Sequence, residues 1–365
     1  MAVSVIARDI RYACVVSEST ANPSAGANGR TSATGQTAVT VRDTLVRMHN
    51  IDRAAWKRLS VVRKWLLMVR APVLVMTLSS SLVGILLAVR AGHFDAWLAF
   101  ALLTGLTLAH ATNNLLNDLV DYSRGLDRSN YFRVRYGVHV LEQELVSRRA
   151  FLAVMLATGA GALAAAAWLV AEKGGAVLAL SAIGAFFVLF YTWPLKYYGL
   201  GELSVLLVWG PLMSGGSYYV LAGGIDAEAL VLSLIAGVGP TLVILGKHLD
   251  KRVQDDSAGV ATLPVALGEA RTRYLTLALV CIQWVLAAGL LAARPASDWW
   301  LLMLLLSIPT ARPLMRVLRR NAPGECPSGY SRDVWPLWFS AFAFRYSRDF
   351  GAMLVLGLVV AALFN

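Results

Sequence analysis

Nine long apolar runs dominate this sequence, and they restrict the chain to folds in which helices cross a membrane. The hydrocarbon core of a bilayer is about 30 Å thick and needs about 20 apolar residues in a helix. Hydrophobic residues make up 57% of the 365 residues and charged residues only 15%. The sequence therefore predicts an all-α, multi-pass membrane protein. The predicted spans are residues 72–90, 96–118, 150–171, 174–193, 202–222, 227–248, 273–293, 298–318 and 341–364.

The first 60 residues differ from the rest of the chain. They are rich in Ser, Thr, Ala and Gly, as in "SESTANPSAGANGRTSATGQTAVT", and contain few large apolar side chains. Burial of so little apolar surface does not offset the entropy lost when a segment becomes ordered. We expect residues 1–60 to be a disordered tail and residues 61–365 to form the membrane domain.

The basic residues indicate how the helices are oriented. The chain carries a net charge of +11, and its Lys and Arg residues gather before the first span and in the loops after the even-numbered spans. Positively charged loops remain on the cytoplasmic side. The sequence therefore predicts a protein of the cell membrane whose N-terminus and long polar loops are cytoplasmic. The lipid bilayer is an expected partner and nucleic acid is not.

Amide and carboxylate side chains cluster at the end of the second predicted span, in "NNLLNDLVDYSRGLD". Asn114, Asn117, Asp118 and Asp121 are three and four residues apart, so a helix would present them on one face. Neutral and charged oxygens of this kind suit Mg²⁺. A carboxylate near the centre of a membrane helix costs about 2.5–3.5 kcal/mol, so the cluster must lie at the interface or in a polar cavity.

A second acidic cluster follows the sixth predicted span, in "GKHLDKRVQDDSAGVATLPVALG", and contains Asp250, Asp255 and Asp256. The two clusters end helices on the same predicted side of the membrane. Facing each other across one cavity, they could hold a diphosphate through bridging Mg²⁺ ions. The alternative is that these residues only cap helix ends, start turns and form i,i+4 pairs with Lys251 and Arg252.

The two clusters resemble the Asp-rich motifs of the UbiA superfamily of intramembrane prenyltransferases. "NDLVDYSRGLD" fits the first motif in the form NDxxDxxxGxD, and "GVATLPVALG" is similar to the tail of the second. The stretch "YTWPLKYYGLGELSVLLVWGPLMSGGSYYV" resembles the branch of the 1,4-dihydroxy-2-naphthoate polyprenyltransferases of menaquinone synthesis. The likeness extends over about residues 69–365.

This resemblance implies helices around a central cavity that opens to the cytoplasmic face. It also implies Mg²⁺-dependent transfer of an isoprenyl group from a polyprenyl diphosphate to an aromatic acceptor, here 1,4-dihydroxy-2-naphthoate. The implied metal ligands are Asn117, Asp118, Asp121, Asp127, Asp250, Asp255 and Asp256. The implied diphosphate-binding residues are Asn114, Arg70, Tyr191, Lys196, Lys247 and Lys251. Asp121, Asp255 and Lys196 are the predicted catalytic residues.

One departure from the family pattern affects the second motif. Asp250 and Asp255 are five residues apart, and five residues on a continuous helix turn the side chains about 140° from each other. Either the helix ends near Asp250 or one of the two aspartates is not a ligand. Two alternative functions are a terpene cyclase of the same fold, which needs no acceptor, and a secondary transporter with Gly-Pro breaks in its helices.

Overall fold

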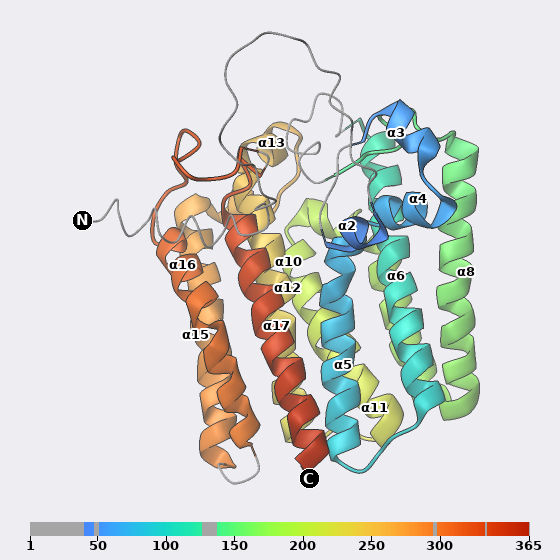
Figure 1. The fold of residues 1–365 in the computed structure, drawn as a ribbon, viewed down its shortest axis with the longest axis vertical. Helices are drawn as coiled ribbons and strands as arrows, with labels where there is room; N and C mark the ends of the chain where they lie inside the picture. The colour runs from blue at the N-terminus through green and yellow to red at the C-terminus, as the bar shows by residue number, and fades with distance from the viewer. Residues whose placement is uncertain (1–39, 47–50, 126–136, 295–297, 333, 365) are drawn as a thin grey trace, which may run out of the picture.

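The protein is a bundle of long helices that run side by side (Figure 1). The computed structural model describes residues 40–46, 51–125, 137–294, 298–332 and 334–364, and these contain helices but no strand. The bundle contains two elements that are not α-helical: η3 is a π-helix and η4 is a 3₁₀-helix. The elements of the bundle are α5 Val75–Arg90, α6 Ala96–Ser123, α8 Arg148–Lys173, α9 Gly175–Phe190, α10 Gly201–Leu207, η3 Val208–Gly215, α11 Gly216–Ala222, α12 Ala227–Asp250, α15 Glu269–Ala293, η4 Trp299–Ser307, α16 Ile308–Leu318 and α17 Phe339–Phe364.

Each predicted span coincides with a helical segment of this bundle. The fifth span, Gly201–Ala222, consists of α10, η3 and α11 joined end to end. Its centre is π-helical around Pro211, which has no N–H group for the regular α-helical hydrogen bond. Among the described residues, seven helices are long and apolar enough to cross a membrane. The all-α membrane fold is confirmed, and nine crossings remain a prediction.

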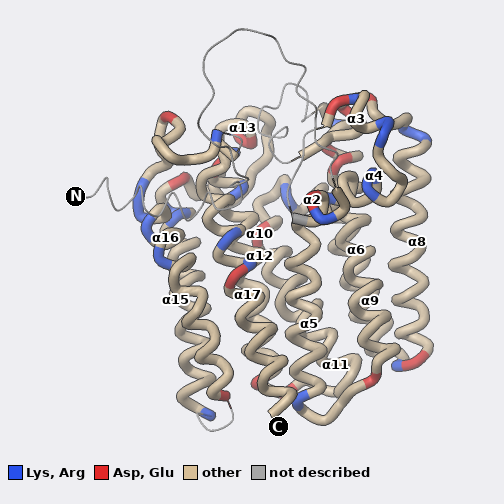
Figure 2. Tube along the Cα trace, in the orientation of Figure 1, with Lys and Arg blue, Asp and Glu red and all other residues tan. Residues whose placement is uncertain are grey.

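The charged side chains gather at one end of the bundle (Figure 2). This end carries the short helices α3 (Arg53–Arg58), α4 (Val61–Met68) and α13 (Arg252–Ser257). The opposite end carries few Lys, Arg, Asp or Glu residues, and the middle of the bundle is almost free of them in this view. This distribution is typical of a bundle that crosses a bilayer with one strongly basic side.

Part of the segment assigned to the tail is folded against the domain. Residues 53–58 form α3, and the Asp52 side chain caps this helix by accepting a hydrogen bond from Ala55 N at 2.7 Å. Trp56 is only 3% exposed and packs in one hydrophobic cluster with Ile51 and Leu59. These large apolar side chains bury surface against the domain, and the Ser- and Thr-rich sequence contains few side chains of this kind. Residues 1–39 and 47–50 lie outside the described residues.

Two glycines bring α12 and α17 into close contact. A Cβ atom on Gly246 would lie 2.8 Å from the backbone of Phe339 and Ser340, and one on Gly239 would lie 2.6 Å from Ser347 Oγ. The two helices are therefore antiparallel along this contact. The end of α12 lies beside the start of α17, and residues about two turns earlier in α12 lie beside Ser347.

Asp250 ends α12 and binds the start of α17, a structural contact that its predicted role as a metal ligand did not include. Asp250 Oδ1 accepts a hydrogen bond from Phe339 N at 2.9 Å. Asp250 Oδ2 accepts hydrogen bonds from Trp338 N at 3.1 Å, from Ser340 N at 3.0 Å and from Ser340 Oγ at 2.5 Å. Both oxygens satisfy donors at a helix N-terminus, which favours a capping role for Asp250 over a role as a metal ligand.

We expect Asp250→Ala to lower the free energy of unfolding by about 1–3 kcal/mol, because three backbone N–H groups lose their acceptor. Thermal unfolding of the detergent-solubilised protein measures the change. Asp256→Ala, at an exposed position on the neighbouring helix, is the matched control and should unfold like the wild type. A variant of normal stability whose activity needs far more Mg²⁺ would contradict the capping role.

Candidate active site

A large cavity of about 1230 Å³ lies among α6, α8, α9, η3, α12 and α17. Its lining on α6 extends from Leu102 to Asn117, which corresponds to about 22 Å at 1.5 Å per residue. Near Asn117 the lining is polar, with Arg70, Asn114, Tyr191 and Lys247. Further along α6, towards Leu102, it is apolar. The cavity therefore combines a polar end with a long apolar interior.

The first acidic cluster lies on the last turns of α6, at the polar end of this cavity. Asn117 lines the cavity, and its amide donates a hydrogen bond to Asp121 Oδ2 at 2.7 Å. Asn114 donates to the backbone oxygen of Val69 at 2.9 Å. Asp118 is buried and forms an ion pair with Arg70. Four of the predicted residues are thus held together within two helical turns.

Lys196 connects this cluster to the segment between α9 and α10. It lies in η2 (Leu195–Tyr198), and its Nζ is 3.0 Å from Asp121 Oδ1. Burial alone would lower the pKa of Lys196. The charge of Asp121 and its hydrogen bond outweigh burial, and Asp255 acts in the same direction, so the pKa lies above its usual value. Lys196 therefore remains charged and interacts electrostatically with both Asp-rich motifs.

The second cluster is divided between two helices. α12 ends at Asp250 and α13 begins at Arg252, so the chain does not continue as one helix through the motif. Asp255 on α13 is 7% exposed, and its Oδ1 is 3.5 Å from Lys251 Nζ. Asp255 Oδ2 is buried without a hydrogen-bond partner. The neighbouring Asp256 is exposed, which argues against its predicted role as a ligand.

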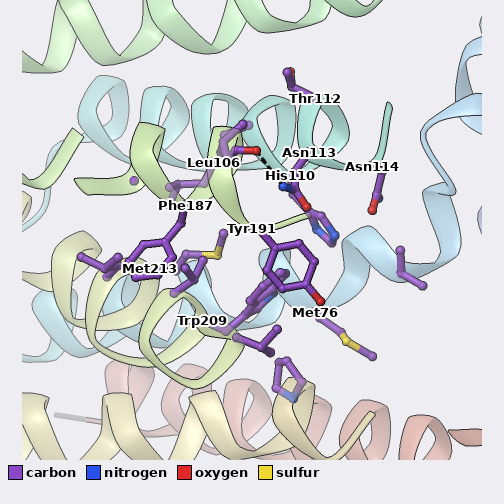
Figure 3. Close-up of a pocket in the computed structure, with 18 of the residues that line it drawn as sticks. Met76, Leu106, His110, Thr112, Asn113, Asn114, Phe187, Tyr191, Trp209 and Met213 are labelled. Atoms are coloured by element: carbon purple, nitrogen blue, oxygen red, sulfur yellow. Dashed lines mark hydrogen bonds between the residues drawn. The ribbon is translucent and has the colours of Figure 1, made fainter. Parts of the chain in front are cut away.

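Tyr191 is an aromatic residue of the cavity lining. It follows α9 and lines the cavity, and Figure 3 shows its side chain near those of Trp209 and His110. Burial raises the pKa of the Tyr191 hydroxyl, and the carboxylate of Glu202 raises it further. Asp121 and Asp255 act in the same direction. The hydroxyl therefore stays protonated and can donate a hydrogen bond to an anion.

Glu202 is a residue of this region that the sequence did not single out as functional. It is 2% exposed, and its Oε1 lies 2.6 Å from His248 Nδ1 on α12. The same oxygen accepts a hydrogen bond from Leu263 N at 3.2 Å. These two contacts hold both ends of the segment that contains Asp255. The position of Glu202 in "GLGE" was a signal of the family branch but not of this contact.

Histidines contribute local hydrogen bonds. His110 Nδ1 lies 2.8 Å from Thr77 Oγ1, and the His110 and Trp209 rings are nearly perpendicular with centroids 5.0 Å apart. His248 is bound to Glu202, as described above. Both histidines therefore already have partners inside the bundle, and neither arrangement presents a base poised for catalysis.

The polar end suits Mg²⁺, although it is not a closed metal cage. Within the described ranges, no three His, Cys, Asp or Glu side chains come together closely enough to hold one ion. Mg²⁺ commonly binds through one or two carboxylates together with water and substrate phosphates, so such a cage is not required. The buried, unpartnered oxygen of Asp255 and the oxygens of Asn117 and Asp121 are hard donors of the right type. Asp127 lies outside the described residues.

Known proteins resemble this chain over most of its length. The sequence profile of the UbiA prenyltransferase family matches residues 77–342. The 1,4-dihydroxy-2-naphthoate octaprenyltransferase of Escherichia coli (strain K12) is 29% identical over 269 residues, covering 71% of this chain and 87% of that protein. The protein of the same name from Mycobacterium tuberculosis (strain ATCC 25618 / H37Rv) is 32% identical over 253 residues, covering 68% and 78%.

Solved structures share the fold. A UbiA homolog from Aeropyrum pernix K1 superposes with a TM-score of 0.59 at 18% identity, covering 79% of this chain and 98% of that chain. A UbiA homolog from Archaeoglobus fulgidus bound to GPP and Mg²⁺ gives a TM-score of 0.55 at 16% identity, covering 82% and 99%. From its sequence and its helical bundle, the chain belongs to the UbiA prenyltransferase family and is a multi-pass membrane prenyltransferase.

Proposed function

We propose that the protein transfers an isoprenyl group from a polyprenyl diphosphate to an aromatic acceptor of the naphthoate type, with the help of Mg²⁺. The names of the bacterial relatives support a 1,4-dihydroxy-2-naphthoate acceptor. The homolog bound to GPP and Mg²⁺ supports the diphosphate and the metal. Family membership decides against the transporter alternative.

The observation that carries this proposal is the convergence of two acidic motifs on one lysine at the polar end of an apolar cavity. Lys196 Nζ lies 3.0 Å from Asp121 Oδ1 on α6, and the backbone oxygen of the next residue, Tyr197, accepts a hydrogen bond from Ala261 N of the second motif at 3.2 Å. Residues 121 and 255 are far apart in the sequence, so only the fold brings them together. A diphosphate with its hydrocarbon tail needs this combination of a polar end and a long apolar interior.

The cations and the phenol at the polar end would bind the diphosphate. Arg70, Tyr191 and Lys247 line the cavity, and Lys196 stands beside Asp121. Guanidinium and ammonium groups form strong charge-assisted hydrogen bonds with phosphate oxygens. The apolar lining from α6, α8 and α9 would take up the isoprenyl chain. Asn114 and Lys251 hold the neighbouring backbone and carboxylate in place.

Asn117, Asp118 and Asp121 on α6 and Asp255 on α13 are the residues that would hold Mg²⁺, with Asp127 as a further predicted ligand. Bound Mg²⁺ supplies positive charge that stabilises the departing diphosphate. Arg70 and Lys196 now balance the charges of Asp118 and Asp121. In the substrate complex these two cations would also face the diphosphate oxygens.

The reaction begins when the bond between the allylic carbon and the diphosphate oxygen breaks, and the electron pair stays with the diphosphate. A ring carbon of the acceptor then attacks the allylic cation, and the ring later loses a proton. Water would capture this cation, so the apolar lining protects it. The faces of Tyr191 and Trp209 in the cavity wall (Figure 3) are suited to stabilise positive charge.

The orientation in the membrane also belongs to the proposal. The end of the bundle with the Asp-rich motifs is the strongly charged end. We assign this end to the cytoplasmic side of the cell membrane, because loops rich in Lys and Arg stay there. The water-soluble diphosphate and Mg²⁺ would then reach the site from the cytoplasm.

The direct test supplies the purified protein with labelled polyprenyl diphosphate, with and without Mg²⁺ and 1,4-dihydroxy-2-naphthoate. We expect a prenylated ring product only when the metal and the acceptor are both present. Chromatography of the labelled products measures the outcome. A cyclic hydrocarbon formed without acceptor would instead support the terpene cyclase alternative.

Asp121→Asn and Asp255→Asn should each reduce kcat/KM by about 100-fold or more, because a neutral amide stabilises Mg²⁺ less well than a carboxylate. Activity measured over a series of Mg²⁺ concentrations checks this expectation. Asp256→Asn is the matched control, since Asp256 is exposed beside buried Asp255. Full metal-dependent turnover by either buried variant would remove that residue from the metal site.

Lys196→Met should raise the KM for the diphosphate by about 10- to 100-fold, the effect expected for one lost charge-assisted hydrogen bond. Initial rates at varied diphosphate concentration give this value. Lys173→Met, at an exposed position at the C-terminal end of α8 and outside the cavity lining, should behave like the wild type. An unchanged KM in Lys196→Met would show that this lysine serves only to anchor Asp121.

A further inference from the structure

The apolar part of the main cavity has a similar depth along two helices. On α9 and directly after it, the lining residues recur every three or four positions and so mark one face of the helix. They include Val177, Ser181, Gly184, Val188 and Tyr191. Tyr191 stands at the polar end, and the 14 positions back to Val177 correspond to about 21 Å at 1.5 Å per residue. This value agrees with the depth along α6.

Buried apolar side chains from four helices line the deep end of the cavity. These are Leu102 of α6, Leu169 of α8, Val177 of α9 and Val220 of α11. An extended chain advances about 1.2 Å per backbone bond, so an isoprene unit with its four backbone bonds covers about 5 Å. A depth of about 21 Å therefore accommodates about four isoprene units in extended form.

Gly184 lies near the middle of this depth, about 10 Å from Tyr191 along α9. Helices α8 and α9 are joined at Gly174, so they run antiparallel, and residues equally far from this joint lie at the same level. Gly184 is therefore level with the part of α8 between Ala162 and Ala166, two small residues of the cavity lining. At this position α9 contributes no side chain to the wall.

The space in front of Gly184 is open. A Cβ atom added there would meet no atom of another described element within 4 Å. In contrast, a Cβ atom on Gly105 or Gly161, where α6 and α8 touch, would lie 2.9 Å from a side chain of the other helix. Glycine destabilises the interior of a helix relative to alanine. Close packing explains Gly105 and Gly161 but does not explain Gly184.

The face of α9 that carries Gly184 is not its outer face. Ile183 and Phe186 are 45% and 46% exposed and are not part of the cavity lining. Gly184 belongs to the lining, so a side chain at this position would enter the cavity.

We propose that Gly184 determines how long an isoprenyl chain the protein accepts, because it keeps the cavity open beyond the second isoprene unit. This inference rests on the proposed function and names a residue that selects the substrate. About two units fit between Tyr191 and Gly184, and about two more fit beyond. The Cα–Cβ bond of a helical residue tilts towards the N-terminus, which in α9 is the deep end. A large side chain at position 184 would therefore displace the third and fourth units and leave the first two in place.

The test measures equilibrium binding of two labelled ligands to the purified protein with Mg²⁺: geranyl diphosphate, with two isoprene units, and geranylgeranyl diphosphate, with four. In Gly184→Phe we expect the Kd for geranylgeranyl diphosphate to rise by about 100-fold or more, because the distal units lose their apolar burial. The Kd for geranyl diphosphate should not change. Gly184→Ala and Gly184→Leu should give a graded series, and Gly184→Leu supplies the same comparison if Gly184→Phe does not fold.

Gly289→Phe is the matched control. Gly289 is exposed on α15, lies outside the cavity lining and also has open space at its Cβ position, so this variant should bind both ligands like the wild type. Equal Kd values for geranylgeranyl diphosphate in the wild type and the Gly184 variants, or equal losses with both ligands, would overturn the role of Gly184.

Binding requires no acceptor, so the result is separate from the acceptor assignment. A selective loss of the longer ligand supports the role of Gly184 even if the wild type transfers no prenyl group to the naphthoate, an absence that would overturn only the proposed acceptor. A wild-type protein that binds neither diphosphate would overturn the proposed function and this inference with it.

Discussion

The ion pair between Lys196 and Asp121 is the interaction on which the arrangement of the site depends. It holds the segment between α9 and α10 against the end of α6 at 3.0 Å. Six residues later, Glu202 binds His248 and Leu263, on either side of Asp255. One short segment thus touches both Asp-rich motifs. Since a largely buried charge is costly when unpaired, this segment and α6 stabilise each other.

The opposite end of the bundle also contains paired charges. Arg90 on α5 forms ion pairs with Glu228 on α12 and with Asp298, the latter at 2.5 Å, and its guanidinium lies 5.8 Å from the ring centre of Trp300. Charges at this end therefore tie helices together instead of lining the cavity. These paired groups lie outside the cavity and leave the lining from α8 and α9 largely apolar, which is what an allylic cation requires if water is to be excluded.

The sequence was sufficient for the spans and for the first motif, because both depend on local periodicity. A run of about twenty apolar residues predicts a membrane helix. Polar residues three and four positions apart are predicted to share one face of that helix. The second motif was only partly predictable, since the roles of Asp250 and Asp255 depend on where α12 stops. Asp250 binds backbone groups 88–90 residues away, and Glu202 binds His248 46 residues away. No local pattern indicates such partners.

Asp250 shows how a residue that resembles a ligand can serve the site from outside it. Its carboxylate joins the end of α12 to the start of α17, and both helices line the cavity. In the proposed reaction Lys247 of α12 would bind the diphosphate. Reacting atoms must approach to about 3–3.5 Å, and a misplacement of about 1 Å can cost about 100-fold in rate. A helix cap can therefore influence catalysis by fixing the relative position of two helices that line the cavity.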